Sequence, residues 1–355
     1  MKINLLCILC VAFSCLTLKG QDMHFSQFTE TPALVNPALT GVDGLRVSAN
    51  YRNQWKSVTV PYNSYGASFE MRSPAIGKRR VGKFGSKTVD RDGRFAAGIS
   101  VYKDKMGDGN FNLTQANLSI SSFVPTGENS HLSVGVQGSF NQRSMDESKF
   151  VFPNQYGGTG YDPNLSSGEK YATSQNYTYM DLGAGVLWSF SDEEKRVEDH
   201  KKVKARFGFS AYHLLQPKQK YLANGGVPLA RKLMANGDFL ISIQNTRVAI
   251  APAYIVSLQG QSREILVGAL LKYYTRNDTK YTGFVKRTSL GIGAYYRNQD
   301  AAIAYMLIEI NGQYAIGVSY DITLSALSQA SNSRGGMELS LRYNVANTFL
   351  YQKMK

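Results

Sequence analysis

Cysteine is almost absent from this sequence, and its few copies are confined to the extreme N-terminus. The same segment carries the positive residue Lys2, an apolar run over residues 5–18 and the small residue Gly20. This order is typical of a secretory signal peptide, and the run is shorter than the roughly 20 residues that a membrane-spanning helix needs. We expect residues 1–20 to be removed, which takes away every cysteine, namely Cys7, Cys10 and Cys15. The mature chain would then fold without a disulfide.

Lipid attachment at Cys15 is an alternative to simple cleavage between Gly20 and Gln21. Residues 12–15 resemble a lipoprotein cleavage box, but the box lacks leucine at its first position. The sequence therefore favours cleavage without a lipid.

Residue patterns that carry catalysis or metal binding are also missing. The four histidines form neither a metal-binding helix motif nor a Cys/His cluster, and no Gly-x-Ser-x-Gly elbow occurs. The pairs Gly183/Gly185 and Gly291/Gly293 lack the third glycine of a dinucleotide loop and fit a curved sheet better. Residues 104–110 resemble a calcium loop, but they lack its middle acid and have Gln115 at the twelfth position. We expect a hairpin turn there, and no catalytic, cofactor or metal site.

Acidic residues are scarce relative to basic ones. Lys and Arg number 40 against 26 Asp and Glu, giving a net charge of +14. For an exported chain, this balance favours lipid phosphates or acidic protein surfaces as partners rather than nucleic acid. The aromatic residues include 22 Tyr against 2 Trp, and a ring with a polar tip suits a membrane–water interface.

The dominant positive signal is an alternation of apolar and polar residues with period two. In residues 45–52, for example, Leu, Val, Ala and Tyr alternate with Arg, Ser, Asn and Arg. Such alternation predicts β-strands, and most segments have the length of about ten residues that a tilted membrane strand needs. We identify fourteen segments, centred near Ala49, Ala67, Ile99, Leu118, Val136, Val186, Phe209, Ile241, Ala251, Ala269, Ile292, Tyr305, Val318 and Leu341. Residues 301–310 are apolar on both faces and admit a short helix as an alternative.

These segments predict an all-β fold, a transmembrane antiparallel β-barrel of about 14 strands. A soluble β-sandwich also alternates, but here the strand number is high and even, and the polar face is rich in Gly, Ser, Asn and Gln. We therefore expect one face to meet lipid, as at Val47, Val136, Val318 and Leu341. The other face would line the lumen, as at Ser48, Gln137, Ser319 and Ser340. Expected turns between strands are Asp43-Gly44, Asp92-Gly93, Asp108-Gly109, Asn236-Gly237 and Asn311-Gly312.

Both ends of the mature chain resemble the PorP/SprF family. The N-terminal features are QDMHFSQF at residues 21–28, NPA at 36–38, Gly41 and RVSANYRNQW at 46–55. The C-terminal features are GVSYD at 317–321, SAL at 325–327 and GMELSLRY at 336–343. The resemblance implies a non-enzymatic outer-membrane component of type IX secretion and gliding machinery, which supports export or surface attachment of large secreted proteins such as adhesins. An outer-membrane channel for small hydrophobic or polar solutes is the alternative, and a purely structural porin is a third.

The resemblance and the strand pattern together suggest four segments. Residues 1–20 are the signal peptide, 21–41 a periplasmic N-terminal segment, 42–346 the outer-membrane barrel and 347–355 a C-terminal tail. Because Asn36-Pro37 favours a fixed turn and Phe25, Phe28 and Leu34 are costly to leave in water, we expect the N-terminal segment to be held in the barrel mouth or on a partner. It would either fill space or bind a partner through Asp22, His24, Phe25, Ser26, Gln27, Asn36 and Pro37.

A basic stretch at residues 78–91 is a solvated loop or a docking patch for an acidic partner, with Lys78, Arg79, Arg80 and Lys83 as candidates. If the first strand starts in the periplasm, this stretch faces periplasmic ring or peptidoglycan-linked proteins. The longest connections, residues 144–176 and 216–235, would then face outward towards the secreted cargo. Expected partners are thus outer-membrane lipid, the secretion machinery and its cargo.

Overall fold

The computed structural model describes residues 22–56, 60–73, 79–81, 87–89, 94–107, 109–127, 129–146, 149–158, 160–168, 176–193, 202–219, 226–276, 288–326 and 328–345. The expected signal peptide and the tail at 347–355 lie outside these residues, so both stay predictions. No helix among the described residues is long and apolar enough to cross a membrane.

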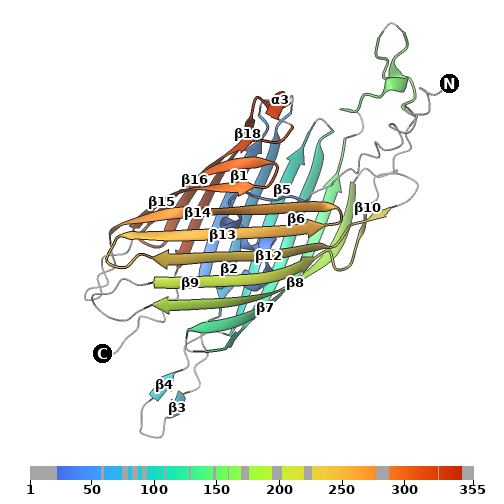
Figure 1. Ribbon diagram of the computed structural model, residues 1–355. Coiled ribbons are helices and arrows are strands. Elements are labelled where there is room, and N and C mark those ends of the chain that lie inside the picture. The colour runs from blue at the N-terminus through green and yellow to red at the C-terminus, as the bar shows by residue number, and fades with distance from the viewer. Residues whose placement is uncertain are drawn as a thin grey trace, which may run out of the picture.

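The fold is a closed antiparallel β-barrel of fourteen strands, in which each strand pairs with its neighbours in sequence and the first pairs with the last (Figure 1). The register of closure runs from Leu45 opposite Val345 to Gln54 opposite Gly336. The strands of the wall are β1 (Leu45–Gln54), β2 (Tyr62–Arg72), β5 (Phe95–Met106), β6 (Phe111–Pro125), β7 (Ser130–Ser144), β8 (Asn176–Glu193), β9 (Lys202–Tyr212), β12 (Lys232–Ser242), β13 (Val248–Gln259), β14 (Ser262–Arg276), β15 (Thr288–Arg297), β16 (Ala301–Ile310), β17 (Tyr314–Thr323) and β18 (Arg334–Val345).

Each of the fourteen predicted centres lies in a different wall strand, so the predicted barrel is confirmed. The ambiguous segment at residues 301–310 is strand β16. Its inner face is apolar because Ile303, Tyr305 and Leu307 belong to a buried apolar cluster that also contains Phe28 from the N-terminal segment. A strand that meets lipid outside and an apolar cluster inside loses the alternation that marks its neighbours.

The predicted faces are confirmed as well. Val136 is 56% exposed on the outer surface, whereas the next residue, Gln137, is 1% exposed in the lumen. The same contrast holds for the other predicted pairs: Val47, Val318 and Leu341 are exposed, and Ser48, Ser319 and Ser340 are buried.

Of the predicted turns, Asp92-Gly93 and Asp108 lie outside the described residues, and Asn236-Gly237 is wrong. Asn236 and Gly237 lie within β12, paired with Ile255 and Tyr254 of β13. A Cβ atom at Gly237 would overlap the ring of Tyr254, so the glycine provides space for a side chain on the adjacent strand. As a result, the connection after β9 ends at Arg231, and residues 232–235 belong to the wall.

Short elements lie outside the wall strands. η1 (Phe28–Glu30), α2 (Pro32–Val35) and η2 (Pro37–Leu39) come before β1. The pair β3 (Arg79–Val81) and β4 (Lys87–Val89) projects beyond one end of the barrel, whereas η4 (Pro153–Gln155) and the pair β10 (Lys218–Gln219) and β11 (Val227–Pro228) lie beyond the other (Figure 1). α3 (Ser328–Ser331) lies in the connection between β17 and β18.

A plugged lumen as the candidate functional site

Residues 22–44, which we call the plug, run through the inside of the barrel from one end to the other. Asp22 contacts Arg143, His213 and Gln259, which lie at the end of the barrel that carries the β7–β8 and β9–β12 connections. We call this the Asp22 end. The plug leaves at the opposite end, the Asp43 end, where β1 begins. The segment expected to be periplasmic, residues 21–41, therefore occupies the lumen from Asp22 onwards.

Near the Asp22 end, backbone amides of the plug bind a carboxylate of the wall. The N–H groups of Ser26 and Gln27 donate to the two oxygens of Glu338 on β18, at 2.7 and 3.0 Å. The Ser26 hydroxyl donates to Asp321 on β17, and the Gln27 amide donates to Ser319 at 3.0 Å. Because all these groups are buried, the bonds fix the plug in one position.

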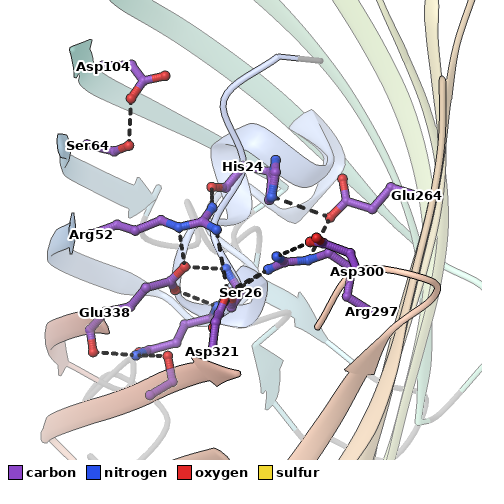
Figure 2. Close-up of polar contacts among 12 residues, drawn as sticks. His24, Ser26, Arg52, Ser64, Asp104, Glu264, Arg297, Asp300, Asp321 and Glu338 are labelled. Carbon is purple, nitrogen blue, oxygen red and sulfur yellow. Dashed lines mark hydrogen bonds and ion pairs between the residues drawn. The ribbon is translucent and has the colours of Figure 1, made fainter. Parts of the chain in front are cut away.

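Two arginines balance the charge of this carboxylate pair (Figure 2). Arg52 Nε lies 3.1 Å from Glu338 Oε1, and Arg297 Nη2 lies 3.2 Å from Asp321 Oδ2. Arg52 also donates to the backbone carbonyl of His24 at 2.6 Å. Two guanidinium groups and two carboxylates thus form one paired, buried network around Ser26, which is the arrangement that buried charges require.

Asp22 is held by a histidine that bridges two acids. His213 Nε2 lies 2.5 Å from Asp22, and His213 Nδ1 lies 2.6 Å from Asp181. Burial works against the charged imidazole, but the hydrogen bonds and charges of the two acids raise the pKa of His213 to about 9. Burial would also raise the pKa of Asp22, but His213, Lys232 and Arg143 lower it well below its usual value. At neutral pH His213 and Asp22 are therefore both charged.

His24, unlike His213, is neutral at neutral pH. Burial lowers its pKa to about 4, although the charge of Glu264 acts in the other direction. The 3.9 Å approach of His24 Nε2 to Glu264 is thus not an ion pair at neutral pH, because the ring is neutral.

In the middle of the lumen, the Asn36-Pro37 turn sits in a recess made by glycines. The Asn36 side-chain amide donates to the carbonyls of Val186 and Phe209 at 3.1 and 3.3 Å. Cβ atoms would overlap Pro37 at Gly135 of β7, and Asn36 at Gly185 of β8 and Gly208 of β9. Three adjacent strands therefore lack side chains where the turn must approach their backbone.

At the Asp43 end, charges of alternating sign connect the plug to the wall. Arg46 and Arg342 bind Glu30 of the plug at 3.2 and 2.7 Å, and Arg206 binds Asp43 at 3.1 Å. This series of ion pairs continues from Arg342 through Glu309 to Lys272, and from Arg206 to Asp238. These residues border an open cavity of about 500 Å³.

The structure brings the predicted N-terminal candidates together in the lumen. Phe25, Ser26, Gln27, Asn36 and Pro37 are buried in the lumen, and Asp22 and His24 are half-buried. They bind the wall of their own chain, so a partner role for them stays a prediction. Arg79 and Arg80 belong to β3, while Lys78 and Lys83 lie outside the described residues. No group of three His, Cys, Asp or Glu side chains in the described part of the chain could hold a metal ion.

Sequence reasoning missed the wall residues that receive the plug. None of Arg52, Asp321, Glu338 and Arg297 was among the predicted site residues. A signal was available, because Asp321 and Glu338 occupy lumen-facing positions of their strands and a buried carboxylate needs a partner. What that partner is cannot be read from the strands themselves.

A family model described as "Type IX secretion system membrane protein PorP/SprF" matches residues 17–343. No curated protein matches the sequence. Among solved structures, the toluene transporter TodX of P. putida is similar with a TM-score of 0.44 and 10% identity, over 89% of this chain and 94% of that one. A Pseudomonas aeruginosa FadL homologue has a TM-score of 0.43 and 11% identity, over 89% and 94%. Omp33 of Acinetobacter baumannii has a TM-score of 0.37 and 8% identity, over 85% and 98%.

Proposed function

The chain belongs to the PorP/SprF family of type IX secretion system membrane proteins, and on this basis we propose that it is a non-enzymatic component of that machinery in the outer membrane. In this role it supports export or surface attachment of large secreted proteins, and the barrel is a scaffold rather than a conduit. The observation that carries the scaffold role is the plug, which is bonded to the wall along the whole lumen.

The plug argues against free passage of a polypeptide or a polar solute. Its removal would separate Ser26 and Gln27 from Glu338, and Glu30 from Arg46 and Arg342. Breaking buried, charge-assisted bonds of this kind is expensive, so the described arrangement is a closed one. A channel or open porin would have to displace the plug, and for this reason we rank both below a scaffold.

The Asp22 end supplies a surface that fits a protein partner. Its two long connections expose apolar side chains beyond the ends of the wall strands. Tyr156 and Tyr161 pair across an isolated bridge, and their rings lie 5.9 Å apart. Exposed Val, Leu and Tyr side chains of this kind are typical of interaction surfaces. The exposed residues here are Val151, Tyr156, Tyr161, Leu165, Leu215 and Val227. With β1 starting in the periplasm, this end is outside and faces the secreted cargo.

The Asp43 end supplies the second surface. The β3–β4 pair extends from it within the basic stretch that contains Lys78, Arg79, Arg80 and Lys83 (Figure 1). A projecting basic hairpin suits an acidic surface on a periplasmic ring or peptidoglycan-linked protein. The two ends of one rigid barrel would then connect cargo with machinery.

Charge reversal tests this assignment. A variant with Lys78, Arg79, Arg80 and Lys83 changed to Glu should lose most co-purification of type IX machinery from native outer membranes, and secretion of the cargo should fall. The matched control reverses four exposed cations of the Asp22 end, Lys56, Lys149, Lys218 and Arg231. It should retain the machinery, since its charges lie at the other end. Equal retention of the machinery by both variants would contradict the assignment.

Topology is tested separately with single cysteines, because the expected mature chain has none. A membrane-impermeant thiol reagent applied to intact cells should label Tyr161→Cys and leave Lys83→Cys unlabelled. Labelling of Lys83→Cys would reverse the two ends.

A further inference from the structure

The cavity at the Asp43 end has the composition of a binding chamber for an amphiphile. The plug contributes Thr29, Glu30, Val42 and Asp43 to its lining. One wall is apolar, formed by Ala253, Leu270 and Leu307 from adjacent parts of the barrel. Its volume of about 500 Å³ lies in the range of small-molecule sites.

The charged part of the chamber favours an anion. Its lining contains six Lys and Arg residues but four Asp and Glu residues; the cations are Arg46, Arg72, Lys204, Arg206, Lys272 and Arg342, and the acids are Glu30, Asp43, Asp238 and Glu309. An excess of cations beside an apolar wall suits a molecule with an anionic head and an apolar chain.

The ladder between β12 and β13 is interrupted beside this chamber. The two strands pair continuously as far as Asp238 opposite Ala253, and again from Ile241 opposite Ile250, in the same register. The two residue pairs between these points, 239/252 and 240/251, are not paired. Position 252 is a proline, which has no N–H to donate to the ladder.

The chamber also reaches residues that belong to the outer face. Phe239 packs against Phe207, which is 37% exposed, with ring centroids 4.8 Å apart. Pro252 lies two residues beyond Ile250, which is 41% exposed, and alternation places it on the same face. Nevertheless both Phe239 and Pro252 line the chamber, together with the inward-facing Leu240 and Ala251. The chamber therefore approaches the lipid side of the wall at this point.

We propose that the chamber binds an anionic amphiphile whose acyl chain passes from the bilayer between β12 and β13 at Phe239 and Pro252. The head group lies among the chamber cations. Lys204 is well placed for it, because it is the cross-strand neighbour of Leu240 and lines the chamber. A free fatty acid and an anionic membrane phospholipid share this chemistry.

Photolabelling in nanodiscs of phosphatidylethanolamine tests the proposal and separates the two sources. One sample contains diazirine-labelled palmitic acid, and the other contains phosphatidylglycerol with a diazirine on its acyl chain. Peptide mass spectrometry should find label on the lumen-facing residues Leu240, Ala251 and Leu270, in addition to lipid-facing Ile241 and Ile250. The probe that labels the lumen identifies the source. Label confined to the lipid-facing residues with both probes would overturn the proposal.

We call the unpaired stretch between β12 and β13 at Phe239 and Pro252 the window. A disulfide across the window supplies a second test of the proposal. Oxidation of a Phe239→Cys/Pro252→Cys variant should lower lumen labelling several-fold relative to the reduced form. The matched pair is Ala235→Cys/Val256→Cys, two directly opposed residues on the same strands where the ladder is intact. Oxidation of this control should leave lumen labelling unchanged. If lumen labelling of the window variant resists oxidation, the ligand does not enter between these strands and the proposal fails.

Discussion

The two ends of the lumen are built from the same alternating strands, yet one is filled and the other is open. At the Asp22 end, Arg52, Asp321 and Glu338 are at most 3% exposed and bind the plug directly. At the Asp43 end, Lys272 and Glu309 are 14% and 22% exposed and border the chamber. The plug rather than the wall makes this difference: it fills the lumen around Ser26, whereas at the Asp43 end it leaves a chamber beside it. Ion pairs that border the chamber should therefore contribute less to stability than the fully buried pairs around Ser26.

The largest expected effect is the loss of Arg52. Arg52→Met leaves Glu338 and Asp321 short of a buried cation, which should cost about 3–5 kcal/mol of the free energy of unfolding. Lys272→Met breaks a pair that water can reach in the chamber, and its cost should be about 1 kcal/mol or less. Urea unfolding in lipid vesicles measures both. Equal losses would show that the two ends do not differ in this way.

An intermediate effect is expected where the plug turns at Asn36-Pro37. Gly135→Val puts methyl groups where Pro37 lies, so it should destabilise the plugged barrel by about 1–3 kcal/mol through overpacking. Gly138→Val on the same strand is the control, since no atom lies within 4 Å of a Cβ built there. Limited proteolysis of the plug and urea unfolding should both distinguish the variants. A destabilised Gly138→Val barrel would point to strand propensity instead.

A pH-dependent effect is expected at the charged bridge at Asp22. Because the pKa of His213 is raised from 6.5 to about 9, its stabilisation is complete below pH 6.5 and is lost as the pH rises through about 9. Asp22→Asn should move this pKa back towards 6.5. Histidine ring NMR in micelles follows the titration, with His24 near 4 as an internal contrast. A His213 that titrates near 6.5 in the unmodified protein would exclude the bridge.

Much of the wall could be predicted because it depends on local pattern. Val136 and Gln137 reveal their faces through alternation alone, since the side-chain direction of a strand has a period of two. The mature N-terminus was also recognised as a held segment, through Asn36-Pro37 and its phenylalanines. The recess that receives this segment was not predicted. Its residues, Gly135, Gly185 and Gly208, are far apart in sequence and form a recess only when three strands lie side by side.

By itself, the sequence determined the class of protein, the number of strands, the faces of the alternating strands and, through its motifs, the family. These properties follow from alternation, composition and residues close together in the chain. Only the tertiary structure decided that the plug spans the whole lumen, that Ser26 and Gln27 bind Glu338 more than 300 residues away, and that a chamber remains at the Asp43 end. Closure of the barrel brings β1 against β18 and encloses the plug. Which polar groups then meet depends on that closed geometry, which no local pattern encodes.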